Sequence, residues 1–103
     1  MVKTVFLGID LGGTNTKVAL VDQEGTILER SIIPTRAMRK AEEVVKDIAS
    51  EAMKLRKRFE ERGFKVQAAG IGIPGLIDWE KGICLLLPNF PNKWRDVPIR
   101  EWL

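Results

Sequence analysis

The feature that most constrains this chain is a glycine-rich segment, residues 8–17 (GIDLGGTNTK), which separates two apolar runs. The flanking runs predict a strand–turn–strand unit over residues 5–21. Gly12 and Gly13 have no Cβ, so the backbone can turn sharply and bring successive N–H groups close to an anion. Asp10 beside such a turn is a natural anchor for a hydrated magnesium ion. The pattern also fits an ordinary β-hairpin that binds nothing, and the glycines alone do not separate the two interpretations.

Composition narrows the class of protein. A chain of 103 residues, 45% hydrophobic and 30% charged, predicts one modest soluble globular domain. The net charge is only +3, and the basic residues over 36–62 alternate with acidic ones, which indicates a solvated helix face and not a nucleic-acid surface. No apolar run is long enough for a signal peptide or a membrane span. Cys84 is the only cysteine, which excludes an internal disulfide and favours a cytoplasmic location.

The remaining pattern predicts mixed α and β structure. The expected elements are a strand over 26–33, a helix over 36–62, a strand over 66–73, a hairpin over 77–87 and a helix over 98–103. Thr35 is the expected N-cap of the long helix, and Gly63 is the residue expected to end it. The predicted core stripe of this helix consists of Met38, Ala41, Val45, Ile48, Ala52, Leu55 and Phe59.

The last predicted helix stops after little more than one turn. A helix this short is marginal in water, because nucleation costs more than one or two hydrogen bonds return. We therefore expect the chain to be the amino-terminal part of a longer protein, with a natural C-terminus as the alternative.

Two sequence blocks carry a resemblance to a known family. Residues 9–22 (IDLGGTNTKVALVD) resemble the first phosphate motif of the actin-like sugar kinases, and in particular of the ROK family. Residues 70–78 (GIGIPGLID), with Pro88-Asn89-Phe90 and Val97-Pro98 further on, resemble its glucokinase-like branch. The resemblance covers nearly the whole chain. It implies a ribonuclease-H-like, actin-like ATPase lobe, in which antiparallel strands 1–3 and a returning parallel strand form a mixed sheet with a long helix packed on it.

The resemblance also implies an ATP-dependent hexose kinase that uses Mg²⁺, with glucose as the favoured sugar. In the turn, Asp10 would orient the hydrated metal, and Gly12 and Gly13 would line the path of the transferred phosphoryl group. The implied nucleotide-phosphate contacts are Thr14, Asn15 and Lys17. A turn-capping role for Asp10 and an ordinary exposed strand position for Lys17 remain as alternatives.

For the sugar, the resemblance implies contacts from Gly75 and Leu76 through backbone atoms, with Asn89 as a nearby polar group. A simple turn role for Asn89 is nearly as good an interpretation. The identity of the sugar and of the phosphoryl donor stays open.

Other parts that the resemblance implies are absent from this chain. The family's catalytic aspartate lies in an Asn-Asp pair, which does not occur here, so no catalytic residue is expected before Leu103. The family's zinc site and its sugar-binding Glu-x-x-His need histidine, and the chain has none. We therefore expect this chain alone to supply the phosphate site and part of the sugar site, and to be inactive.

Two other functions fit the same residues. Some relatives are sugar-sensing repressors with a helix-turn-helix ahead of the kinase-like part; here the first strand begins within a few residues of Met1, which argues against that function. The chain could instead be a structural half that pairs with a missing carboxyl-terminal lobe or with a second copy as a homodimer. The candidate surface for self-association is Leu85, Leu86, Leu87, Trp94 and Trp102.

Overall fold

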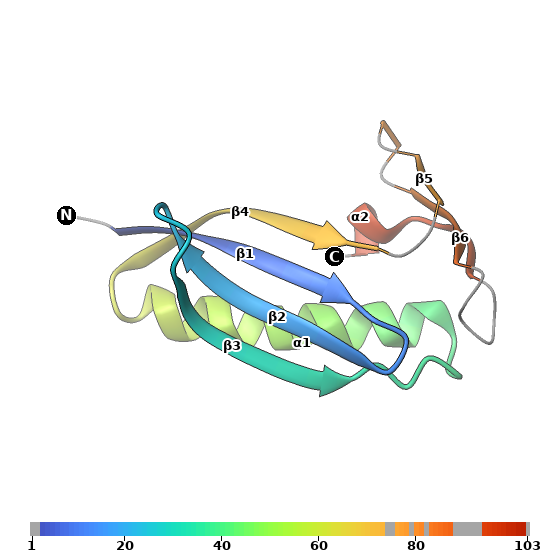
Figure 1. Ribbon diagram of the computed structural model, residues 1–103, viewed down its shortest axis with the longest axis horizontal. Coiled ribbons are helices and arrows are strands. Elements are labelled where there is room, and N and C mark those ends of the chain that lie inside the picture. Colours follow the sequence, from blue (N-terminus) through green and yellow to red (C-terminus); the bar gives the residue numbers. More distant parts are fainter. Residues whose placement is uncertain (1–2, 74–75, 79, 82, 88–93, 103) are drawn as a thin grey trace.

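The computed structural model describes residues 3–73, 76–78, 80–81, 83–87 and 94–102. Its main part is a four-stranded sheet with one long helix across one face (Figure 1). The elements of this part are β1 (Lys3–Leu11), β2 (Asn15–Asp22), β3 (Ile27–Pro34), α1 (Ala41–Glu60) and β4 (Phe64–Gly72).

The sheet has the mixed topology that the resemblance implied. Its strand order is β3-β2-β1-β4, with β1–β2 and β2–β3 antiparallel and β1–β4 parallel. Helix α1 makes the crossover from β3 at one edge to β4 at the other. A parallel strand cannot be reached by a tight turn, so a crossover of this length is required. The expected fold class is confirmed.

The core lies between α1 and one face of the sheet. Successive strand side chains alternate between faces, so β1 directs Val5, Leu7, Ile9 and Leu11 toward the helix. The helix contributes a stripe at three- and four-residue spacing. Its buried members are Val44, Val45, Ile48, Ala52, Leu55 and Phe59. Met38 does not belong to this stripe as expected, since it precedes the helix and is 81% exposed.

Helix α1 begins later than the sequence pattern predicted. Its first residue is Ala41, and the N-cap residue Lys40 makes no side-chain capping hydrogen bond. The prediction of Thr35 as N-cap is therefore wrong, because its hydroxyl bonds to the backbone of a distant turn instead. The helix ends at Glu60, and the turn after it finishes with Gly63 at a φ of +88°.

A second sheet lies beyond the end of β4 (Figure 1). It consists of β5 (Leu76–Asp78), β6 (Ile83–Leu87) and β7 (Trp94–Val97), all antiparallel, and is followed by α2 (Ile99–Trp102). Val97 joins the main core, and Arg100 donates a hydrogen bond to the carbonyl oxygen of Glu80 at 2.7 Å. Among the residues described, there is no helix with the length and apolar character needed to cross a membrane.

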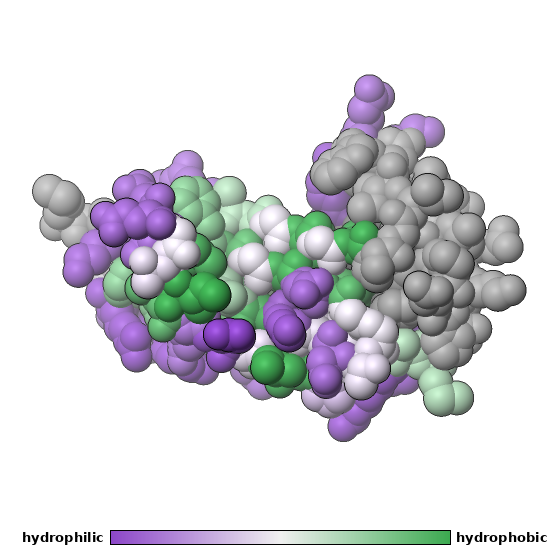
Figure 2. All heavy atoms as spheres, in the orientation of Figure 1, coloured by the Kyte–Doolittle hydropathy of each residue, from purple (hydrophilic) through white to green (hydrophobic). Residues whose placement is uncertain are grey.

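The face of the main sheet opposite α1 is open. It carries exposed apolar side chains, including Phe6 on β1 at 37% exposure and Ile32 on β3 at 56%. Figure 2 shows residues of hydrophobic and intermediate hydropathy gathered over the middle of this face. The same face carries the polar residues that the sequence singled out, because Asp10 and Lys17 have the outward parity of their strands.

Candidate functional site

The glycine-rich turn joins β1 to β2 at the carboxyl end of β1. A Cβ added to Gly12 would overlap the backbone oxygen of Asn15, whereas a Cβ on Gly13 would meet open space. The two glycines therefore have different roles. Gly12 is required by the tight path of the backbone, and Gly13 leaves room outside the turn.

Thr35 holds the turn from the side of α1. Its backbone N–H donates to the carbonyl oxygen of Thr14 at 2.9 Å, and its hydroxyl donates to the carbonyl oxygen of Gly12 at 2.7 Å. The Thr16 hydroxyl lies 2.8 Å from the Thr35 hydroxyl. Since Thr35 has one hydroxyl proton and gives it to Gly12, Thr16 must be the donor in this pair. Both threonines are buried, at 0% and 2% exposure.

These bonds fix the direction of the peptide groups in the turn. The described residues contain no cis peptide bond, so in this turn a carbonyl and the N–H that follows it point in opposite directions. With the Gly12 carbonyl directed at Thr35, the N–H of Gly13 points away from it. Neither the Gly13 nor the Thr14 N–H donates a hydrogen bond to any residue that the structure describes. The turn thus presents free backbone donors, as an anion-binding concavity requires.

Asp10 and Lys17 lie beside the turn on the open face. They are direct cross-strand partners in the β1–β2 register, and both are exposed. Asp10 also pairs with Gly72 of β4, and a Cβ on Gly72 would lie 4.0 Å from an Asp10 carboxylate oxygen. The absent side chain at Gly72 leaves the carboxylate accessible.

The remaining predicted nucleotide residues lie at the same end of β1. Thr14 and Asn15 are both exposed, so their side chains are accessible to a ligand at the turn. Of the predicted sugar contacts, Gly75 and Asn89 lie outside the described residues. Leu76 is the first residue of β5, four positions after the end of β4.

The donor set fits a magnesium ion held mainly by phosphate and water. Mg²⁺ is commonly bound by one or two protein carboxylates together with substrate phosphates, and Asp10 supplies one exposed carboxylate beside the free amides. Within the described part of the chain, no three histidine, cysteine or acidic side chains come together as a metal cluster. Asp10 is thus the residue that would hold the ion.

Sequence reasoning missed the two buried threonines. Thr16 has the same inward parity as Val18 and Leu20 on β2, so it is a hydroxyl at a core position. A buried hydroxyl needs a hydrogen-bond partner. The inward position of Thr16 in the strand pattern could therefore have indicated that it bonds to another polar group in the core. No local pattern identifies Thr35 as that partner, since it is 19 residues away.

Comparison with known proteins agrees with this architecture. A sequence model of the ROK family matches residues 6–103. The chain is 37% identical over its full length to a glucokinase of Thermotoga maritima, and 29% identical over 92% of its length to a xylose repressor of Caldicellulosiruptor bescii. It spans 31% of the first protein and 23% of the second.

A solved structure of a ROK family protein has a similar fold. The ROK family glucokinase of Streptomyces griseus, crystallised with glucose and AMPPNP, superposes with a TM-score of 0.78 at 31% identity. The match covers 95% of this chain and 28% of that one. Since the family match extends over nearly all of the sequence and the sheet, crossover helix and turn agree with it, the chain belongs to the ROK family.

Proposed function

We propose that this chain is the phosphate-binding part of an ATP-dependent hexose kinase, with glucose as the favoured sugar. The observation that carries the proposal is the turn between β1 and β2, whose Gly13 and Thr14 N–H groups have no acceptor among the described residues and whose neighbours are Asp10, Asn15 and Lys17. The names of the Thermotoga and Streptomyces relatives support a kinase, and the glucose and AMPPNP in the latter support the sugar and an ATP-like donor.

In the proposed reaction, a sugar hydroxyl oxygen bonds to the γ-phosphorus of ATP. The bond from that phosphorus to the β–γ bridging oxygen breaks, ADP leaves, and a carboxylate accepts the hydroxyl proton. The turn amides and the Lys17 ammonium neutralise phosphate charge, while Gly13 leaves space for the phosphoryl group. Asp10 would hold a magnesium ion beside the turn, and that ion would supply positive charge to offset the charge of the phosphates. The base is assigned to the part of the kinase outside residues 1–103.

A chimera tests this proposal. Residues 1–103 replace the matching segment of the Thermotoga glucokinase, and ADP release with glucose is measured. We expect sugar-dependent turnover that falls by about a hundredfold in Asp10→Asn, since each 1.36 kcal/mol lost from transition-state stabilisation is tenfold in rate. Asp22→Asn, which changes a carboxylate in the other hairpin turn, is the matched control and should retain the activity. A folded chimera that binds glucose without turnover would contradict the proposal.

A second candidate is self-association of the lobe. The support is structural: β4 is a nine-residue edge strand without proline, and the open sheet face exposes Phe6 and Ile32. Unpaired edge strands and exposed apolar faces both favour association. The expected result is a mass that doubles with concentration in sedimentation equilibrium, and that stays monomeric in Phe6→Lys. A strictly monomeric wild-type chain at high concentration would exclude it.

The repressor relative does not change the first proposal. Its identity to this chain is 29%, against 37% for the Thermotoga glucokinase. A sugar sensor needs the sugar site but no free phosphate-binding amides. Nucleotide binding at the turn therefore separates the two functions.

A further inference from the structure

We propose that Thr35 is a positioning residue for the phosphate-binding turn, acting through two hydrogen bonds that determine which way its peptide groups face. The inference rests on the proposed nucleotide role of the turn. Thr35 comes from the loop before α1, 21 residues after Thr14 in the sequence, and it contacts the backbone carbonyls of Gly12 and Thr14. Its effect on a ligand would come from the orientation of Gly13.

The contacts of Thr35 are directional at both ends of the turn. Its hydroxyl donates to the Gly12 carbonyl oxygen at 2.7 Å, and its N–H donates to the Thr14 carbonyl oxygen at 2.9 Å. A flip of the Gly12–Gly13 peptide would turn the Gly13 N–H inward and leave the buried Thr35 hydroxyl proton without its acceptor, while Thr16 would still donate to the Thr35 oxygen. An unsatisfied buried polar group costs roughly 1–3 kcal/mol. The buried Thr35 hydroxyl therefore disfavours the flipped state, in which the turn would present a carbonyl oxygen to a phosphate.

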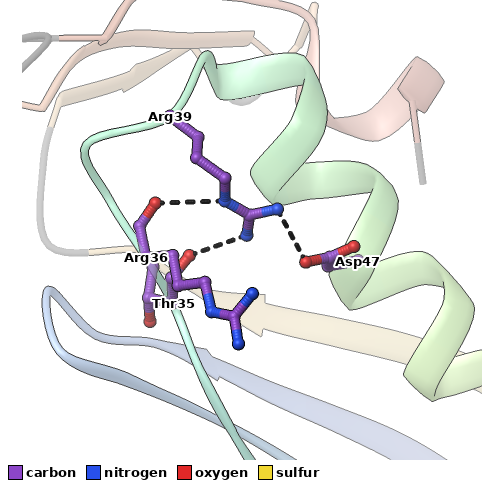
Figure 3. Close-up of polar contacts among 4 residues, drawn as sticks. All are labelled: Thr35, Arg36, Arg39 and Asp47. Atoms are coloured by element: carbon purple, nitrogen blue, oxygen red, sulfur yellow. Dashed lines mark hydrogen bonds and ion pairs between the residues drawn. The ribbon is translucent and has the colours of Figure 1, made fainter.

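Thr35 is itself held in place by α1. Figure 3 shows the Arg39 guanidinium between the loop and the helix. Its Nη2 donates to the Thr35 carbonyl at 3.1 Å, its Nε donates to the Arg36 carbonyl at 3.3 Å, and its Nη1 pairs with Asp47 at 2.8 Å. Arg36 has a φ of +51°, a left-handed backbone that is uncommon outside glycine. The arginine thus holds an unfavourable loop conformation that directs Thr35 at the turn.

The test compares Thr35→Ser with Thr35→Ala in the 103-residue chain. Both variants lose the methyl group of Thr35, and they differ only in the hydroxyl. The first measurement is the ¹⁵N–¹H residual dipolar coupling of Gly13 without ligand, which reports the direction of that N–H. The second is the Mg-ADP dissociation constant from the chemical shifts of the turn. Ser31→Ala is the control, because it removes another sheet-to-helix hydrogen bond, from Ser31 to Glu51 at 2.6 Å, away from the turn.

We expect Thr35→Ser to retain the wild-type Gly13 coupling and to bind Mg-ADP within about twofold of wild type. Thr35→Ala should alter the coupling and weaken binding about tenfold, the effect of one hydrogen bond of ordinary net strength. Ser31→Ala should lower stability without changing either quantity. If the alanine and serine variants agree in coupling and affinity, the proposal is overturned.

The two measurements also separate this inference from the proposed function. A wild-type chain that binds no Mg-ADP would count against the nucleotide site, while the Gly13 coupling would still decide the role of Thr35. If Thr35→Ala does not fold, Thr35→Val, which keeps the volume of the side chain, takes its place. A valine variant with the wild-type coupling would likewise overturn the proposal.

Discussion

The two hairpin turns of the main sheet differ in where their hydrogen bonds go. In the β2–β3 turn, the Asp22 carboxylate accepts from the N–H groups of Glu24 and Thr26, both at 2.9 Å, and the Asp22 carbonyl accepts from Gly25 at 3.2 Å. This turn satisfies the N–H groups of Glu24, Gly25 and Thr26 with acceptors of its own. In the β1–β2 turn, Thr35 instead donates to the carbonyls of Gly12 and Thr14, and within the described part of the chain the N–H groups of Gly13 and Thr14 have no acceptor.

This difference separates a structural turn from a candidate binding turn within one sheet. Both turns contain glycine, and both join antiparallel strands. In the β2–β3 turn, the N–H groups of Glu24, Gly25 and Thr26 are already used and are not available to a ligand. A turn whose carbonyls are held from outside can keep its amides available without losing its shape. The distribution of donors, and not the glycine content, distinguishes the two.

The substitution of Gly12 gives the largest expected effect on stability. Gly12→Ala should lower the free energy of unfolding by about 3 kcal/mol, because the new Cβ overlaps the Asn15 backbone and cannot be relieved by a side-chain rotation. Gly25→Ala should cost about 1 kcal/mol, since its φ of +87° is unfavourable for a residue with a Cβ. Urea unfolding measures both values. Equal losses for the two would show that Gly12 is an ordinary turn glycine.

Gly13→Ala is the matched variant beside Gly12→Ala. Its Cβ meets nothing within 4 Å, so stability should change by less than about 0.5 kcal/mol. The methyl group would occupy the space in which we place the phosphate, so Mg-ADP binding should weaken. Calorimetric titration measures the change in Mg-ADP affinity, and urea unfolding measures the change in stability. If both the Mg-ADP affinity and the stability are unchanged, the phosphate does not bind beside Gly13 as proposed.

Removing the carboxylate of the structural turn should have an intermediate effect. Asp22→Ala deletes the acceptor of two backbone N–H groups and should cost about 1–2 kcal/mol, comparable to loss of a helix cap. Because the β2–β3 turn lies at the far end of β2 from the candidate site, Mg-ADP affinity should not change. A loss of affinity in this variant would mean that the two turns are coupled.

Asp10→Asn should have only a small effect on stability. Asp10 is exposed and faces Lys17 across the strands, and a cross-strand pair of this kind contributes about 0.5 kcal/mol. The nucleotide should still bind, but added magnesium should no longer strengthen binding. Titrations with ADP in the presence and absence of Mg²⁺ measure this difference. If magnesium strengthens ADP binding to Asp10→Asn as much as it does to the wild type, Asp10 does not hold the metal and its role is structural.

The fold was largely predictable because its signals are local. Strand alternation and the helical stripe from Val45 to Phe59 each follow from the spacing of apolar residues. The glycine pair predicted the turn, and the family resemblance supplied the strand order. The site residues Asp10, Gly12, Gly13, Thr14, Asn15 and Lys17 do gather at one end of the β1–β2 pair. Their binding roles remain predictions.

What could not be predicted depends on tertiary contacts. Thr35 has the local chemistry of an N-cap, but its hydroxyl gains a buried partner at Gly12, and the helix starts six residues later at Ala41. Met38 matched the stripe by spacing, yet it lies in the loop that Arg39 and the left-handed Arg36 hold outside the helix. The sequence pattern around Thr35 does not indicate whether its hydroxyl caps the helix or donates to a distant carbonyl.

The most direct test of the account compares the two turns in one ¹H–¹⁵N NMR titration of the chain with Mg-ADP. The account predicts shifts that saturate at Gly13, Thr14 and Asn15, with none at Glu24, Gly25 and Thr26, and their loss in Gly13→Ala. Shifts spread equally over both turns, or no shift at either turn up to millimolar nucleotide, would contradict the claim that free amides make the β1–β2 turn a phosphate site.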